Sequence, residues 1–180
     1  MNLTETPLTQ TMVFEGKIIR VRVDNARLPN GNTAKREVVE HNGGVCIAAL
    51  TAQDELLFVR QFRYPYGEVV LELPAGKLEK GEDPLEAGKR ELKEETGANA
   101  ACYESLGQLY PSPGYCGEII YMYLATDLSF GDQNPDDDEF LEVERIPLET
   151  AVEMVLSGEI KDAKTQAAIL KIDAKRRRKA

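Results

Sequence analysis

The chain has 180 residues, 42% of them hydrophobic, which suits one globular domain or one domain with a small appendage. Its net charge of −9 argues against nucleic acid as the main partner, because phosphate backbones are bound by basic surfaces. No signal peptide opens the chain, no apolar stretch reaches the length of a membrane span, and Cys46, Cys102 and Cys116 follow no metal-binding spacing. We therefore expect a cytoplasmic protein with free thiols and no membrane partner.

The first part of the chain has the pattern of antiparallel strands. Residues 11–23 alternate between apolar and polar side chains, and residues 35–41 form a second extended run. Asn30-Gly31 between them favours a turn, since both residues tolerate positive φ. We predict an amino-terminal antiparallel hairpin or sheet over residues 1–42, followed by the main domain over residues 43–180.

The main domain alternates strand and helix patterns. Short apolar or alternating runs bounded by turn residues predict six further strands, at 45–50, 55–62, 69–73, 103–110, 119–125 and 140–146. Two helices are predicted near the carboxyl end, at 148–156 and 162–175. A basic run at 175–179 follows, and it favours either a solvated helix end or a contact with an anionic partner.

A third helix is predicted between Pro84 and Gly97. Asp83 is suited to the helix cap, Pro84 to the first helical position, and Gly97 to the residue that ends the helix. We expect Leu85, Gly88 and Leu92 to form its buried stripe, with Gly88 allowing close packing on a sheet.

This helix carries Glu91, Glu94 and Glu95, which lie on one face because they are spaced i, i+3 and i+4. Three carboxylates so close together repel one another, and hard divalent cations such as Mg²⁺ or Mn²⁺ remove that repulsion by binding to oxygen ligands. The pattern therefore predicts a metal site that acts on a phosphate ester or pyrophosphate. The alternative is a solvated surface helix in which Arg90 pairs with Glu94.

The full segment from Gly76 to Ala98 reads Gly-x5-Glu-x7-Arg-Glu-apolar-x-Glu-Glu-x-Gly-apolar. It resembles the Nudix box of the Nudix hydrolases, which cleave a nucleoside diphosphate linked to another moiety. The order of the flanking strands is also similar to that family. The resemblance implies an α/β (α+β) fold, with a Nudix-type mixed β-sheet sandwiched between helices.

The resemblance also assigns roles within the box. Glu91 and Glu95 are expected to be metal ligands, Glu94 to complete the site, and the carbonyl of Ala75 to add a further ligand. Arg90 and Glu82 are expected to orient these ligands through charged hydrogen bonds. We expect two or three Mg²⁺ ions, with Mn²⁺ as a possible substitute, and we count Glu82, Arg90 and Glu94 among the catalytic residues.

A general base is expected outside the box. In the family members that this chain resembles, the base lies on a loop before a late strand, which here is the acidic run 136–139. Glu139 aligns best by the residues that follow it. Asp136, Asp137 and Asp138 are alternatives.

Several positions resemble bacterial ADP-ribose pyrophosphatases within the family. Pro113 lies 16 residues after Gly97, a spacing similar to a marker of that group. The resemblance implies that Arg36 and Arg63 contact the pyrophosphate or terminal ribose and that Glu72 lies beside the site. The predicted reaction is hydrolysis of ADP-ribose to AMP and ribose 5-phosphate. The alternatives are another nucleotide sugar, such as GDP-mannose, or a non-catalytic sensor that binds ADP-ribose.

The same resemblance implies a homodimer that pairs through the amino-terminal hairpin. The chain has no tryptophan, so the adenine would have to stack on another aromatic residue. The candidates are Phe14, Phe62, Tyr64, Tyr66 and Tyr115. His41, the only histidine, is expected to be structural.

Overall fold

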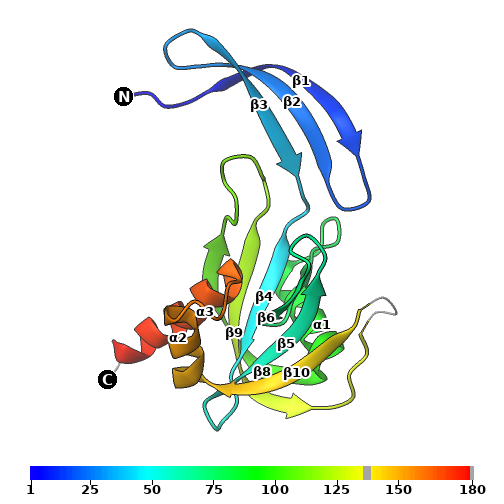
Figure 1. The fold of residues 1–180 in the computed structure, drawn as a ribbon, viewed down its shortest axis with the longest axis vertical. Helices are drawn as coiled ribbons and strands as arrows, with labels where there is room; N and C mark the ends of the chain where they lie inside the picture. The colour runs from blue at the N-terminus through cyan, green and yellow to red at the C-terminus, as the bar shows by residue number, and fades with distance from the viewer. Residues whose placement is uncertain (136–138, 179–180) are drawn as a thin grey trace. The chain divides into compact units, whose positions relative to one another are not determined.

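The computed structural model describes residues 1–135 and 139–178, and these form two compact units (Figure 1). The first unit contains Met1–Gly43 together with Tyr110–Ile119, and the second contains Gly44–Leu109 and Ile120–Ala180. The segment around Pro113 therefore belongs with the amino-terminal strands, although it lies far from them in the sequence.

The first unit is a three-stranded antiparallel sheet in the order β1-β2-β3, rather than a two-stranded hairpin. The strands are β1 (Thr6–Glu15), β2 (Arg20–Arg27) and β3 (Thr33–Glu40). The run predicted at 11–23 is divided between the first two strands by a turn in which the Gly16 N–H donates to the Ile19 carbonyl. Every residue of β1 is exposed, so this strand buries little apolar surface within the chain.

The second unit has two sheets. A mixed sheet has the order β7-β4-β9-β8, in which β4 (Gly44–Ala49) and β9 (Ile120–Phe130) are parallel. Its outer strands are β7 (Ala75–Lys77) and β8 (Ala98–Leu109). An antiparallel sheet has the order β10-β5-β6, built from β10 (Leu141–Pro147), β5 (Glu55–Arg63) and β6 (Glu68–Glu72).

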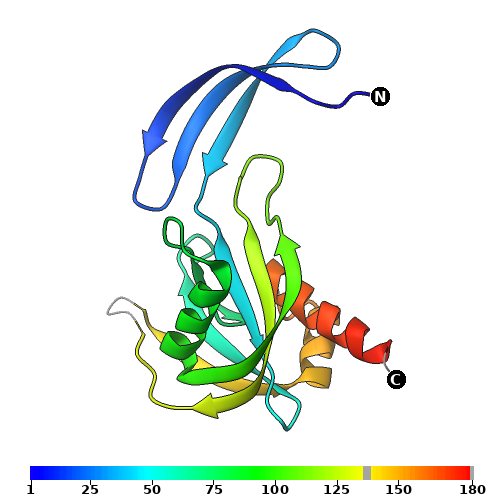
Figure 2. The ribbon, with the colours of Figure 1, turned by 180° about the vertical axis from the view of Figure 1, so that it is seen from behind.

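Helices cover both faces of the mixed sheet, as Figures 1 and 2 show. Helix α1 (Pro84–Thr96) lies on one face, and α2 (Leu148–Leu156) and α3 (Ala163–Arg177) lie on the other. Alternate residues of the fully buried β4 divide between the two cores: Ile47 packs in a cluster with Leu92 of α1, and Cys46 in one with Ile169 of α3. This arrangement confirms the predicted mixed sheet between helices.

The predicted buried stripe of α1 was correct for Gly88 and Leu92 but not for Leu85, which is only half-buried. A Cβ on Gly88 would lie 2.5 Å from Ile47 Cδ1, so the helix does pack closely on β4. The buried face also includes Glu91 and Glu95. Among the described residues, no helix is long and apolar enough to cross a membrane.

Candidate active site

Local hydrogen bonds define both ends of α1. The Asp83 carboxylate accepts from the N–H groups of Leu85 at 2.9 Å and Glu86 at 3.1 Å. At the other end, Gly97 has a φ of 69° and donates its N–H to the Lys93 carbonyl. These ends are as the sequence predicted, and they fix which residues of the helix face the sheet.

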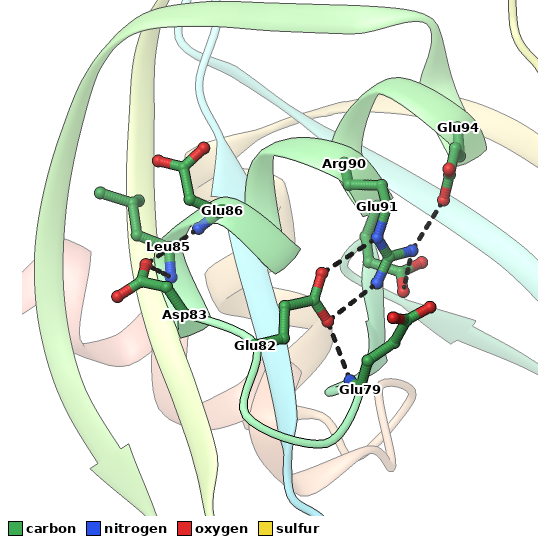
Figure 3. Close-up of polar contacts among 8 residues, drawn as sticks. All are labelled: Glu79, Glu82, Asp83, Leu85, Glu86, Arg90, Glu91 and Glu94. Atoms are coloured by element: carbon green, nitrogen blue, oxygen red, sulfur yellow. Dashed lines mark hydrogen bonds and ion pairs between the residues drawn. The ribbon is translucent and has the colours of Figure 1, made fainter.

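Arg90 connects three carboxylates, as Figure 3 shows. Its Nη1 donates to Glu91 and Glu94, both at 2.9 Å, and its Nε donates to Glu82 at 3.2 Å. Burial alone would lower the pKa of Arg90, but its bonds to Glu82, Glu91 and Glu94 raise that pKa. The guanidinium therefore stays charged, and we call Glu82, Arg90, Glu91, Glu94 and Glu95 the carboxylate cluster.

Glu82 is itself held in place. Its carboxylate accepts from the Glu79 N–H at 2.9 Å as well as from Arg90, and Figure 3 shows both bonds. Burial raises the pKa of Glu82, but its bonds to Arg90 and Glu79 outweigh that effect, so the pKa lies below the ordinary value. Glu82 is thus an ionised partner of Arg90.

Glu91 lies directly against the backbone of β7. A Cβ built on Gly76 would fall 1.9 Å from the carboxyl carbon of Glu91, so only glycine leaves room for this carboxylate. Burial and the charges of Glu94 and Glu139 raise the pKa of Glu91, although Arg90 opposes them. The glycine that opens the predicted motif is therefore required by contact with one of its carboxylates.

Glu95 is the most deeply buried member of the cluster, with 2% of its surface exposed. Its Oε2 accepts from the Ala75 N–H at 3.0 Å. Burial is the main reason that its pKa rises to about 8; Glu91 and Glu139 also raise it, whereas the Ala75 hydrogen bond lowers it. A carboxylate in this position is costly to ionise unless a cation arrives.

Glu139 is half-buried and precedes β10. Its charge acts on both Glu91 and Glu95, whose pKa values it raises, so it belongs to the same electrostatic environment. The competing candidates Asp136, Asp137 and Asp138 lie outside the described residues.

Arg63 and Glu72 form a second pair beside the cluster. Arg63 Nε and Nη2 donate to the two carboxylate oxygens of Glu72 at 2.6 and 2.8 Å. Lys164 of α3 also donates to Glu72 and lies 3.0 Å from Asp162. We call Arg63, Glu72, Asp162 and Lys164 the Lys164 network. The charges of Arg63 and Glu95 influence each other's pKa, which shows that the network and the cluster are electrostatically connected.

Two predicted substrate residues belong to the first unit. Arg36 lies on β3, where its Nε and Nη2 donate to the Glu5 carboxylate at 2.9 and 2.6 Å. Pro113 is exposed in the segment Tyr110–Ile119.

The donor set of the carboxylate cluster suits a hard divalent cation. Among the described residues, however, no three His, Cys, Asp or Glu side chains are already grouped as they would be around an ion. Arg90 explains this arrangement, because it draws Glu82, Glu91 and Glu94 toward itself. Glu91 and Glu95, whose pKa values are raised by burial and by neighbouring carboxylates, are the side chains that a cation would stabilise most.

Sequence reasoning assigned no role to Lys164. A usable signal was present, because a lysine two residues after the Asp162 cap opposes the positive end of a helix. Such a lysine needs carboxylate partners, and Asp162 is one that the sequence itself places beside it.

Comparison with known proteins agrees with this geometry. Residues 32–168 match the NUDIX domain family, and residues 5–39 match the nucleoside diphosphate sugar hydrolase N-terminal domain. The chain belongs to the NUDIX domain family.

Particular relatives cover nearly the whole chain. An ADP-ribose pyrophosphatase of Bacillus subtilis (strain 168) is 42% identical over 93% of this chain and 92% of the relative. A methanol dehydrogenase activator of Bacillus methanolicus is 39% identical over 92% of this chain and 90% of the relative. A crystal structure of an ADP compounds hydrolase covers 100% of this chain and 98% of that chain, with a TM-score of 0.87 and 23% identity, which supports the fold.

Proposed function

We propose that this protein hydrolyses the pyrophosphate bond of ADP-ribose, with Mg²⁺, to give AMP and ribose 5-phosphate. The observation that carries the proposal is the intact carboxylate cluster, in which Glu91 and Glu95 are buried with raised pKa values. Such carboxylates bind divalent cations, and divalent cations are what a pyrophosphate needs in order to approach an acidic site.

The names of the relatives do not by themselves select this function, because the pyrophosphatase and the dehydrogenase activator cover nearly the same part of the chain. The chemistry of the site favours hydrolysis. A protein that only binds a nucleotide or a partner does not need several carboxylates on one helix, with one of them packed against a glycine of the neighbouring strand.

We assign metal binding to Glu91, Glu94, Glu95 and the carbonyl of Ala75. Two or three bound Mg²⁺ ions, or Mn²⁺ in their place, would supply charge neutralisation and acidification of the attacking water. The assignment of Ala75 is supported by its N–H, which donates to Glu95 and brings its backbone beside that carboxylate. Gly76 keeps the space for Glu91.

Arg90 and Glu82 position these ligands. Arg90 holds Glu91 and Glu94 from one side, and Glu82 together with the Glu79 N–H fixes the guanidinium. Because carboxylate rotamers are otherwise free, this arrangement lowers the entropy that the ligands lose when a cation binds.

We propose Glu139 as the general base that takes the proton from the attacking water. Its effect on the pKa values of Glu91 and Glu95 supports the assignment, since a base must lie close to the metal-bound phosphate.

We assign substrate binding to Arg63, Arg36, Glu72 and Pro113. Arg63 supports its assignment best, because two of its nitrogens are held by Glu72 while the side chain remains 38% exposed. A guanidinium fixed in this way presents its remaining donors to phosphate or ribose oxygens without further ordering.

We further propose a cytoplasmic homodimer in which residues 1–42 form the dimerisation region and residues 43–180 the hydrolase domain. Strand β1 pairs with β2 on one side only and exposes Leu8, Met12 and Phe14. Edge strands of this kind pair with other strands. Light scattering at micromolar concentration tests the proposal: a monomer would refute it.

The substrate is tested with a panel of ADP-ribose, GDP-mannose, ADP-glucose, diadenosine polyphosphates and 8-oxo-dGTP, each with Mg²⁺ in ¹⁸O water. We expect the highest kcat/KM for ADP-ribose, with the label in AMP or ribose 5-phosphate. If GDP-mannose ranks first, the substrate is wrong but the reaction class holds. If no pyrophosphate is cleaved, the proposed function is wrong.

A further inference from the structure

Lys164 occupies a position that is unfavourable for a lysine. Its side chain is only 10% exposed, and it lies in the first turn of α3, where the helix dipole is positive. Burying an ammonium group is costly unless partners compensate for the lost water. The position therefore calls for an explanation in terms of what Lys164 contacts.

The compensation comes from two carboxylates. Lys164 donates to Glu72, and its Nζ lies 3.0 Å from Asp162. Burial lowers the pKa of Lys164, but Asp162 and Glu72 outweigh burial and raise it. For Glu72, burial raises the pKa, and Arg63 and Lys164 together bring it below the ordinary value. Lys164, Glu72 and Arg63, whose own pKa is raised by Glu72, are thus held in their charged forms.

Glu72 is the shared element of this network. It is 3% exposed; its Oε1 accepts from Arg63, and its Oε2 accepts from both Arg63 and Lys164. Arg63 uses Nε and Nη2 in this contact; among the described residues, Nη1 has no hydrogen-bond partner. Lys164 is therefore connected to Arg63 through the buried Glu72 carboxylate, and Arg63 keeps Nη1 as an unused donor.

The same helix end also holds the backbone that leads into the site. Thr165, which is completely buried, accepts from the Leu73 N–H at 2.9 Å through its hydroxyl. The Pro74 carbonyl accepts from Ile47, and the Ala75 N–H then donates to Glu95. The first turn of α3 thus contacts residues 72 and 73, directly before the loop that borders the carboxylate cluster.

We propose that Lys164 is a positioning residue for substrate binding: it orients Glu72, and Glu72 in turn holds Arg63 in place to bind the substrate. The proposal rests on the proposed function, because it takes Arg63 as a substrate contact. The Lys164 side chain contacts Glu72 and Asp162, neither of which belongs to the carboxylate cluster.

A contribution to stability alone does not account for this arrangement. Replacing a buried ion pair by apolar residues of similar volume is often neutral or stabilising, because the charges no longer have to be desolvated. An apolar side chain cannot supply a second hydrogen-bond donor to the Glu72 carboxylate. Such a donor holds Glu72 in place while Nη1 of Arg63 binds the substrate.

The first test is Lys164→Met, which keeps the length of the side chain and removes its charge. The buried Glu72 carboxylate would then keep Arg63 as its only cationic partner and draw it away from the substrate. We expect KM for ADP-ribose to rise about tenfold, the effect of losing one charged hydrogen bond, with kcat changed less than about twofold. An unchanged KM in the folded variant would overturn the proposal.

Lys161→Met is the matched control. It removes the same charge three residues earlier in the sequence, where Lys161 pairs with Glu68 in an exposed contact at 2.9 Å. We expect its KM to stay within about twofold of wild type, since exposed ion pairs contribute little. An equal rise in KM in both variants would overturn the proposal, because net charge alone would then explain it.

A double-mutant cycle with Glu72→Gln separates positioning from a general structural role. If Lys164 acts through Glu72, the double variant should have the KM of the worse single variant, which lies above the wild-type KM. Multiplying effects would overturn the proposal. The double variant also covers the case in which Lys164→Met fails to fold, since it removes the unpaired Glu72 carboxylate. A folded double variant with the wild-type KM would count against the proposal.

The wild-type assay separates this inference from the proposed function. If the wild-type chain cleaves ADP-ribose and Lys164→Met leaves its KM unchanged, only the inference fails. If the wild-type chain leaves every nucleotide sugar in the panel intact, the proposed function fails and takes the inference with it.

Discussion

The carboxylate cluster and the Lys164 network are built from the same kinds of group in the same unit, but their charge balance differs. The cluster contains four carboxylates and one guanidinium, whereas the network pairs two carboxylates with two cations. In the network, Glu72 has a lowered pKa and Lys164 a raised one, so both favour the charged form. In the cluster, Glu91 and Glu95 have raised pKa values and resist ionisation.

The difference shows how to distinguish a binding site from a support. In a network with equal numbers of carboxylates and cations, each charge has a partner within the network, and these contacts hold the side chains in fixed orientations. An unbalanced one must take up protons or cations, and that demand is what makes it able to bind a ligand. Four predictions test this distinction.

The largest effect is expected for Glu95→Gln. It removes the most buried carboxylate of the cluster while keeping its shape, so turnover of ADP-ribose should fall roughly a thousandfold, or about 4 kcal/mol of transition-state stabilisation. Steady-state kinetics with Mg²⁺ measures this. Glu86→Gln is the control, because Glu86 lies on the same helix with its side chain 65% exposed. Similar losses of turnover in both variants would contradict a catalytic role that is specific to the carboxylate cluster.

The next effect is expected for Gly76→Ala. The new methyl group would lie 1.9 Å from the carboxyl carbon of Glu91 and push that ligand aside. A displacement of about 1 Å at a catalytic group can cost roughly a hundredfold in rate, and we expect a loss in kcat of that order. Gly131→Ala is the control, since its nearest contact would be an ordinary 3.9 Å. A fully active Gly76→Ala variant would contradict the assignment of Glu91.

Arg90→Gln should have a smaller effect. The three carboxylates would lose the group that orients them, and turnover should fall about ten- to thirtyfold, in the range of residues that support metal ligands. Mg²⁺ affinity by titration calorimetry should change less, because the loss of a neighbouring positive charge offsets the loss of orientation. Lys89→Gln, which removes an exposed charge paired with Glu86, is the control. A kcat within twofold of wild type would mean that Arg90 only stabilises the helix.

The last prediction concerns stability instead of turnover, and it is a dependence on pH. The pKa of Glu95 is about 8 in the folded protein against an ordinary 4.5, so the folded state keeps a proton that the unfolded state has lost between these values. Without metal, the free energy of unfolding should therefore fall as pH rises from about 5 to 8. By calorimetry, the Tm of wild type should fall by roughly 10 °C over this range, and the Tm of Glu95→Gln should stay nearly constant. Mg²⁺ should stabilise wild type more at pH 8 than at pH 5, because ligand carboxylates must be deprotonated. An identical slope in both proteins would contradict the raised pKa.

Much of the fold followed from local sequence signals. The ends of α1 at Asp83 and Gly97 were predicted because cap and stop residues act through neighbouring backbone groups. Strand β4 was predicted from a short apolar run, and it is indeed buried on both faces. Strand β7 was missed, since three residues carry too little pattern to be recognised and pair only because β4 lies alongside.

The errors at the site have the same origin. The buried stripe was predicted from apolar residues, so Leu85 was included and the inward positions of Glu91 and Glu95 were not foreseen. Charged residues normally lie on the exposed face of a helix. Here Glu91 can face inward because Gly76 of the neighbouring strand leaves room for its carboxylate. Lys164 was given no role, because its partner Glu72 lies 92 residues away in the sequence.

By itself, the sequence determined the spacing of the carboxylates, the limits of the helix that carries them and the class of chemistry they suit, because all of these depend on residues within a few turns of one another. The tertiary structure decided which carboxylates are buried, how far their pKa values rise and which cations hold Glu72. These properties arise from desolvation and from charges on other elements, and both exist only after distant segments have packed together.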